Sequence, residues 1–168
     1  DGFSPITLSN REGQIVVSTS IQGGFPHEIA EELKAGISRE FFYYAVLYRV
    51  IPRWYDEEKV SKTVRFTVKY DLLKKQFWVS RHRESEVSDQ IFDTYREMER
   101  WVSTLSDLPL SPVAGLSKRH RYYVSVKAEM KAGEAPTILK YALFFVPYSK
   151  FSTPWVRSPI FDADDLKP

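Results

Sequence analysis

Cysteine is absent from this sequence of 168 residues. Its absence removes disulfide bonds, thiolate metal ligands and cysteine nucleophiles together. Histidine is scarce: the chain has 3, His27, His82 and His120, and no two of them stand at a spacing typical of metal ligands. A G-x-S-x-G nucleophile elbow and a glycine-rich phosphate loop are missing as well. We therefore predict no catalytic constellation, no metal site and no cofactor, and we expect the protein not to be an enzyme.

Long hydrophobic runs and an excess of charge of one sign are also missing. The longest apolar stretch, 41–50, is interrupted by Arg49 and is much shorter than the roughly 20 residues of a membrane span. Lysine and arginine number 24 against 22 acidic residues, a net charge of +2. A nucleic-acid partner would show a strong basic excess. The short basic run 118–123 is more typical of a solvated strand entry, so we expect no nucleic-acid partner.

Aromatic residues, by contrast, are abundant at 15%, with 4 Trp, 10 Tyr and 11 Phe. Large flat side chains at this density favour pleated, half-buried surfaces and hence strands. Alternating or continuous apolar patterns predict strands near 6–8, 14–21, 39–51, 63–70, 76–82, 122–130 and 139–146. The stretch 39–51 is apolar on both faces, so we expect it inside a sheet and covered on both sides.

Two segments have helical periodicity. Ile29, Leu33 and Ile37 predict a short helix near 27–36. A second apolar set predicts a helix over 89–105 that begins at Ser88 or Asp89. The predicted buried stripe of this second helix is Ile91, Tyr95, Met98, Val102 and Leu105.

The connections complete the fold prediction. We expect a polar loop at 83–88, a loop or edge segment at 107–116, and a solvated polar tail at 162–168. Strands follow strands through hairpin-length connections, which argues against a doubly wound parallel sheet. The predicted fold is a single domain, 1–168, that is mainly β with some helix. We expect an antiparallel β-sandwich, immunoglobulin-like in general architecture, with about seven strands and two short helices.

The corner after the central strand concentrates arginines, acids and aromatic rings, from Arg49 to Glu57. One interpretation is structural: guanidinium groups stack on the rings and pair with Asp56, which braces the corner. The other is functional, because tryptophan, tyrosine and arginine are favoured at binding hot spots. The candidate binding residues are Arg49, Arg53, Trp54, Tyr55, Asp56 and, near the C-terminus, Trp155.

Several of these motifs resemble one family over nearly the whole chain. The motifs are Leu47-Tyr48-Arg49, the corner Arg53-Trp54-Tyr55-Asp56-Glu57, the hairpin Lys69-Tyr70-Asp71-Leu72, the strand Tyr122-Tyr123-Val124 with Lys127-Ala128-Glu129, and the ending Phe151, Thr153, Trp155, Arg157, Ser158, Pro159 and Phe161. Together they are similar to the bacterial domain-of-unknown-function family 4390. Two departures are Val46, where the family commonly has Glu, and Trp54-Tyr55 in place of its tandem aromatic pair.

The resemblance implies an exported protein of Gram-negative type bacteria, periplasmic or anchored to the membrane through a removed N-terminal segment. Family genes often stand near sensor histidine kinases, which implies an envelope protein partner such as a sensor or membrane protein. The family has no assigned catalytic residues. We expect a non-catalytic binding or signalling-accessory module. The alternatives are a carbohydrate- or lipid-binding domain that uses Trp54, Trp78 or Trp155, and a hydrolase of unrecognised type. The oligomeric state stays open.

Overall fold

The computed structural model describes residues 2–132 and 151–167, and these form an antiparallel β-sandwich. The larger sheet has the strand order β10-β9-β4-β5-β6-β7, with β11 also paired to β9. Its strands are β4 (Arg39–Arg49), β5 (Glu57–Asp71), β6 (Gln76–Arg83), β7 (Glu86–Phe92), β9 (Tyr122–Ala132), β10 (Phe151–Ser152) and β11 (Val156–Arg157). This sheet and a smaller second sheet, described next, confirm the predicted fold class.

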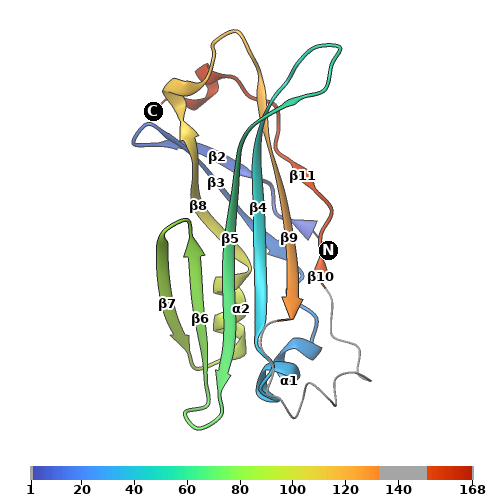
Figure 1. Cartoon of the computed structure of the whole chain (residues 1–168), viewed down its shortest axis with the longest axis vertical. Coiled ribbons are helices and arrows are strands. Elements are labelled where there is room, and N and C mark those ends of the chain that lie inside the picture. The colour runs from blue at the N-terminus through green and yellow to red at the C-terminus, as the bar shows by residue number, and fades with distance from the viewer. Residues whose placement is uncertain (1, 133–150, 168) are drawn as a thin grey trace.

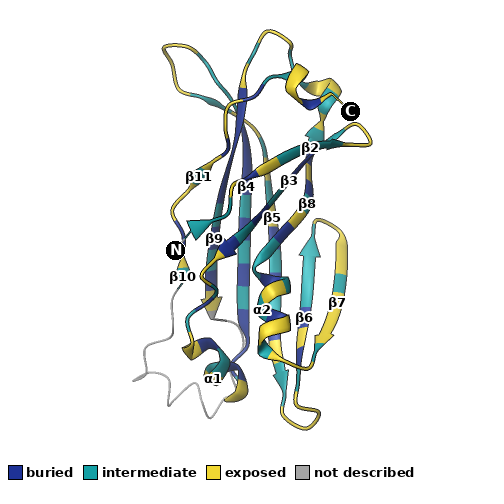
Figure 2. Cartoon of the chain, turned by 180° about the vertical axis from the view of Figure 1, so that it is seen from behind, coloured by how far each residue is buried: buried dark blue, intermediate teal, exposed yellow. Residues whose placement is uncertain are grey.

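The smaller sheet and the helices form the second layer. The smaller sheet contains β1 (Gly2–Phe3), β2 (Thr7–Arg11), β3 (Gln14–Gln22) and β8 (Thr104–Pro112), with β3 paired to the other three. The helical elements are α1 (Glu28–Lys34), α2 (Tyr95–Val102) and the 3₁₀ turns η1 (Val113–Gly115) and η2 (Ala163–Leu166). The smaller sheet and both α-helices lie on one face of the larger sheet, as the two opposite views show (Figures 1 and 2).

Alternation along the long strands builds the core between the layers. In β4, Phe41, Tyr43, Ala45 and Leu47 are buried and belong to the core. The hydroxyl of Tyr43 is satisfied there, since it donates a 2.5 Å hydrogen bond to the carbonyl of Val102. The predicted inward set of β5, which is Val64, Phe66 and Val68, is at most 1% exposed.

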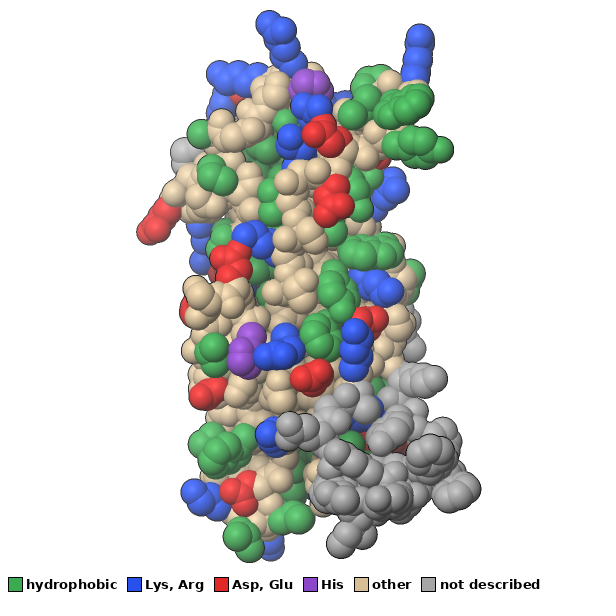
Figure 3. All heavy atoms as spheres, viewed as in Figure 1, with side chains coloured by type: hydrophobic (Ala, Val, Ile, Leu, Met, Phe, Trp, Pro, Cys, Tyr) green, Lys and Arg blue, Asp and Glu red, His purple; other side chains and the backbone are tan. Residues whose placement is uncertain are grey.

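The central strand is an interior strand, as predicted, because β4 pairs with β5 on one side and β9 on the other. It ends at Arg49 rather than at the predicted residue 51. The expectation that both faces are covered is wrong for the described residues. On the face away from the second layer, Phe42, Tyr44 and Tyr48 are only half-buried. Figure 3 shows this outer face, with hydrophobic groups interspersed among charged ones.

The predicted helix over 89–105 is wrong in its first part and at its end, because α2 spans only Tyr95–Val102 and Leu105 is buried on strand β8. Residues 86–92 form strand β7, which pairs with β6, so the segment 83–88 contains a hairpin turn and not an extended polar loop. Helix α2 begins after Thr94, whose hydroxyl accepts from the backbone N–H of Glu97 at 3.2 Å. Ile91 is therefore 55% exposed on β7, whereas Met98 and Val102 are buried on α2 as predicted.

The end of the chain is docked, and the prediction of a wholly solvated tail is wrong. Asp162 caps η2 through a reciprocal pair of bonds with Asp165, and Leu166 is 5% exposed. Asn10 on β2 donates a 2.9 Å hydrogen bond to the carbonyl of Leu166. The segment 107–116 contains the later part of edge strand β8, which begins at Thr104. One of the two predicted alternatives, an edge segment, therefore holds for 107–112. The strand predicted at 139–146 lies outside the described residues.

Candidate functional site

The connection between β4 and β5 is held by two acidic side chains. Arg49 forms an ion pair with Glu57 across the ends of the two strands. Asp56 accepts a 2.7 Å hydrogen bond from the hydroxyl of Tyr123 on β9 and a 3.3 Å bond from the backbone N–H of Ile51. These contacts brace the corner, which agrees with the structural interpretation for Arg49 and Asp56.

The tip of the same connection projects into solvent. Arg53 adopts a left-handed conformation with φ of 63°, which makes the turn after Pro52 sharp. Trp54 is 74% exposed and Tyr55 is 83% exposed, with their ring centroids 5.8 Å apart. No ion pair joins Arg53 to Asp56 within the described chain. The structural interpretation is therefore wrong for Arg53, and neither ring is buried as a brace.

The C-terminal segment is fastened to β9 by hydroxyl groups as well as by backbone pairs. The Thr153 hydroxyl accepts from the N–H of Ala128, and the Ser158 hydroxyl accepts from the N–H of Val124, both at 2.9 Å. Between these anchors β11 pairs with β9, which sets the segment 155–157 beside the outer face of the larger sheet. Two buried hydroxyl anchors therefore position an exposed tryptophan and an exposed arginine.

These segments enclose a hollow of about 390 Å³ on the outer face, which we call the outer hollow. Tyr48 from β4, the 55–56 corner, β9 and the 155–157 segment all contribute to it. Its lining consists of Tyr48, Tyr55, Asp56, Tyr123, Ser125, Trp155 and Arg157. The hollow thus brings together residues that are more than 100 positions apart in the sequence.

The rings of the outer hollow rest on one another. Tyr48 and Tyr123 are stacked with centroids 5.3 Å apart, and the Arg157 guanidinium carbon lies 4.7 Å from the Tyr123 ring. Trp155 is 6.5 Å from Tyr44, so the aromatic surface continues along β4. The Tyr123 ring is consequently held between a second ring and a cation, which limits its freedom before any ligand arrives.

Two tyrosine hydroxyls on this face remain protonated donors at neutral pH. Burial and the hydrogen bond to the Asp56 carboxylate raise the pKa of Tyr123 to about 12, although the positive charge of Arg157 acts to lower it. Burial and the bond to Glu129 raise the pKa of Tyr44 to about 12. Both groups are therefore suited to donating hydrogen bonds, and neither is suited to acting as a general base.

The structure brings together three of the candidate residues and leaves three outside the lining. Tyr55, Asp56 and Trp155 line the outer hollow, whereas Arg53 and Trp54 lie at the exposed tip and Arg49 pairs with Glu57. The sequence prediction did not include Tyr123, Ser125 and Arg157 among the candidate residues, and it named Tyr48 only within a family motif. The available signal was the strict alternation of β9, which places Tyr123 and Ser125 on the face opposite Tyr122 and Val124.

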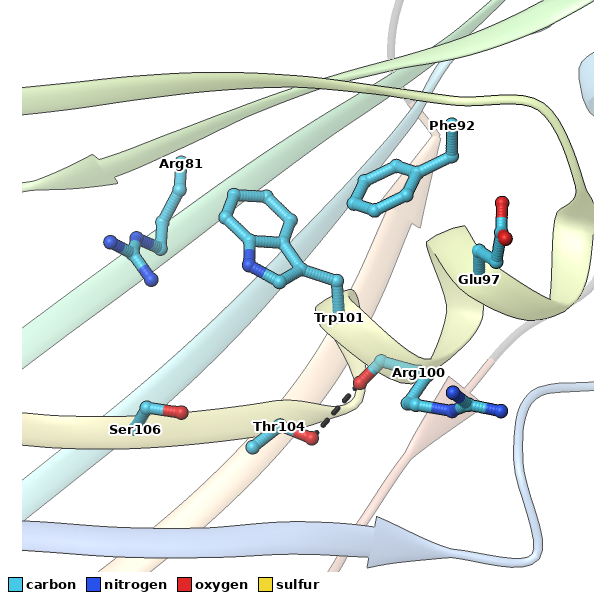
Figure 4. Close-up of a pocket in the computed structure, with 7 residues that line it drawn as sticks. All are labelled: Arg81, Phe92, Glu97, Arg100, Trp101, Thr104 and Ser106. Carbon is cyan, nitrogen blue, oxygen red and sulfur yellow. Dashed lines mark hydrogen bonds between the residues drawn. The ribbon is translucent and has the colours of Figure 1, made fainter.

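A second hollow, of about 550 Å³, lies beside α2 at the open side of the sandwich (Figure 4). Its floor is aromatic: Trp101 packs edge-on against Phe66 at 5.3 Å and lies 5.8 Å from Phe92. The guanidinium of Arg81 lies 5.2 Å from the Trp101 ring, and Arg100 stands at the rim. Glu97 also lines this hollow, so charged groups of both signs stand around its aromatic floor.

The described ranges contain no group of three or more histidine, aspartate or glutamate residues that could hold a metal ion. The histidines stand on separate elements: His27 precedes α1, His82 is on β6 and His120 is in the loop before β9. Among the helices of the described chain, none has the length and apolarity needed to cross a membrane.

Fold and surface define an antiparallel β-sandwich domain with an aromatic hollow on the face of its larger sheet that points away from the second layer. The family model described as "Domain of unknown function (DUF4390)" matches residues 3–159. The chain belongs to that family, as the sequence motifs indicated. No curated protein and no solved structure matches it.

Proposed function

We propose that this domain is a non-catalytic binding module of the bacterial cell envelope that recognises a partner protein through the outer hollow. The observation that carries the proposal is the composition of the hollow, in which Tyr55, Trp155 and Arg157 line the same space as the carboxylate of Asp56. Tryptophan, tyrosine and arginine are the residues that most often dominate binding energy at protein interfaces.

Preorganisation supports the same proposal. Tyr123 is fixed by its bond to Asp56 and by its contact with Arg157, so a partner would meet groups that have already lost much of their freedom. Binding to ordered groups costs less conformational entropy than binding to mobile ones. The arginine and the aspartate give the hollow charges of both signs, which suits a partner segment that carries a complementary pair.

The proposed location is the periplasm, either free or anchored to the membrane, with an envelope sensor or membrane protein as the partner. Family membership supports this location, because resemblance to the family implies an exported protein.

A photocrosslinking experiment tests the proposal. Tyr55, exposed at the edge of the hollow, is replaced by a photoreactive phenylalanine, and the crosslinked envelope protein is purified and its affinity measured. We expect Trp155→Ala and Arg157→Ala each to weaken that affinity by about tenfold or more. Trp78→Ala is the matched control, because Trp78 is 46% exposed against 49% for Trp155 and does not line the hollow. Equal losses for Trp78 and Trp155 would contradict the proposal.

A carbohydrate ligand is the second candidate, favoured by the exposed rings of Tyr55 and Trp155 beside the polar groups of Asp56 and Ser125. Sugars bind to such combinations of aromatic faces and fixed polar groups. NMR titration of the purified domain with envelope oligosaccharides distinguishes the two candidates. Saturable shifts confined to the outer hollow, lost in Trp155→Ala, would favour the sugar.

A further inference from the structure

The turn between β5 and β6 lies at one end of the molecule (Figure 1). It contains two exposed leucines. Leu72 is 63% exposed and Leu73 is 96% exposed. The Asp71 carboxylate accepts from the backbone N–H groups of Leu73 and Lys74, at 2.9 and 3.0 Å, and Lys75 takes a left-handed φ of 54°. These two hydrogen bonds fix the backbone of the turn. In this fixed conformation the side chains of Leu72 and Leu73 point into solvent and not into the core.

Basic and aromatic groups surround these leucines. Lys74 and Lys75 follow them directly and are exposed. The Lys74 ammonium lies 5.9 Å from the ring of Trp78 on β6, which is 46% exposed. On the adjacent edge strand β7, Ile91 stands opposite Trp78 in register and is 55% exposed. We call the set Leu72, Leu73, Lys74, Lys75, Trp78 and Ile91 the hairpin tip.

We propose that the hairpin tip is a membrane-docking site that inserts Leu72 and Leu73 into the surface of an anionic lipid bilayer. Apolar side chains of interfacial segments bury roughly 5–10 Å into the boundary between headgroups and acyl chains. Lysines beside them bind anionic headgroups while their aliphatic stems remain in contact with apolar groups. Tryptophan is enriched at this same depth, because its ring is amphipathic.

Charge complementarity favours a bilayer over other occupants of this surface. The acids near the tip are engaged within the protein: Asp71 holds the turn, Asp93 accepts from Gln76 at 3.2 Å and Asp89 accepts from Ser80 at 2.7 Å. Accepting a hydrogen bond leaves these carboxylates charged, but the hairpin 69–78 carries Lys69, Lys74 and Lys75 against the single acid Asp71, so positive charge predominates beside the leucines. The alternative occupant is a second copy of the chain, paired antiparallel along edge strand β7. If the centre of β7 lay on the twofold axis, Asp89 of one copy would stand directly opposite Asp89 of the other. Like charges in directly opposite positions are destabilising.

Docking through the hairpin tip leaves the outer hollow accessible. Strand β5 joins the two sites, since the corner precedes Glu57 and the tip follows Asp71. A strand of this length spans roughly 45 Å at the usual rise per residue. A domain resting on the bilayer through its tip would present the outer hollow to the aqueous phase. The inference does not rest on the proposed function, because lipid binding and partner binding use separate residues.

Vesicle flotation with the full chain tests the inference. We expect binding to vesicles that contain phosphatidylglycerol and much weaker binding to vesicles of phosphatidylcholine alone. Leu73→Ser should lower the partition coefficient by about tenfold, and Lys74→Gln with Lys75→Gln should lower it by about fivefold per lysine and reduce its salt dependence. Ile160→Ser is the matched control, because Ile160 is 53% exposed and lies outside the tip.

Tryptophan fluorescence gives a second readout. Emission should shift to the blue on binding to anionic vesicles, and Trp78→Phe should reduce that shift. Trp155→Ala should leave vesicle binding unchanged, which separates this test from that of the outer hollow. Absence of binding to anionic vesicles, or binding unaffected by Leu72→Ser with Leu73→Ser, would overturn the inference. Loss of the crosslinked protein partner in the leucine variants, without vesicle binding, would assign the tip to a protein instead.

Discussion

The hydroxyl of Tyr123 donates a 2.7 Å hydrogen bond to the carboxylate of Asp56, a residue 67 positions earlier in the chain. This bond links the β4–β5 corner to β9 and forms one wall of the outer hollow. It makes Asp56 a structural residue and a lining residue at once. The two roles are separable, because only the structural role affects the free energy of unfolding.

We expect Tyr123→Phe and Asp56→Asn each to lower the free energy of unfolding by about 1 kcal/mol, because each removes or weakens a hydrogen bond to a charged group. The double variant should lose less than the sum of the two single losses, since both substitutions act on the same bond. Urea denaturation of the four proteins measures this coupling. Strictly additive losses would show that the bond does not contribute to stability.

Trp54→Ala should leave the free energy of unfolding within about 0.5 kcal/mol of the parent, because the ring is 74% exposed at the tip of the corner. Trp101→Ala is the comparison, and it should cost about 2 kcal/mol or more through lost contacts with Phe66 and Phe92. Thermal and urea unfolding of both variants decide the matter. A large loss for Trp54→Ala would restore the structural interpretation of the whole corner.

Met98→Ala should destabilise the domain by about 2–5 kcal/mol, because Met98 is fully buried between α2 and the sheets. Ile91→Ala should be nearly neutral, since Ile91 is exposed on β7. Chemical denaturation of the pair tests the boundary between β7 and α2. Similar losses for both would mean that the two residues share one buried stripe, as the sequence periodicity predicts.

Alkaline pH should weaken the fold through Tyr44 and Tyr123. Their pKa is raised from the ordinary 10.0 to about 12, so between these values the folded state binds more protons than the unfolded state. The free energy of unfolding should therefore fall as pH rises from about 10 to about 12, while this contribution stays constant below about 10. Denaturation midpoints across this range measure the slope. Burial also raises the pKa of Tyr43 and Tyr95, so Tyr44→Phe with Tyr123→Phe should reduce the slope without abolishing it. An unchanged slope would contradict the prediction.

The long strands and the class of the fold were predictable from the sequence because their signals are local. Alternation in β5 and β9 repeats every two residues, so it identifies the buried face without knowledge of the partner strand. Pro52 cannot donate to a sheet ladder, and the central strand ends close to it. The family motifs were local as well, and they led to the correct family.

The boundary between β7 and α2 was not predictable, because the helical period extends past it. Ile91 stands at helical spacing from Tyr95 and Met98, and the segment 86–92 has no clear alternation of its own, since Phe92 directly follows Ile91. Pairing with β6 decides the outcome for 86–92, and that pairing depends on a hairpin turn in which Glu84 takes a left-handed φ of 51°. Such a conformation in a residue other than glycine has little signal in the sequence.

The sequence by itself determined most of the long strands, the family and the types of residue available for recognition. Only the tertiary structure decided which of those residues meet and which are exposed. The pairing of β11 with β9 brings Trp155 beside Tyr48 and Asp56, and the order of the Asp71 turn leaves Leu73 in solvent. Exposure and proximity depend on contacts between distant segments, and a one-dimensional pattern does not contain those contacts.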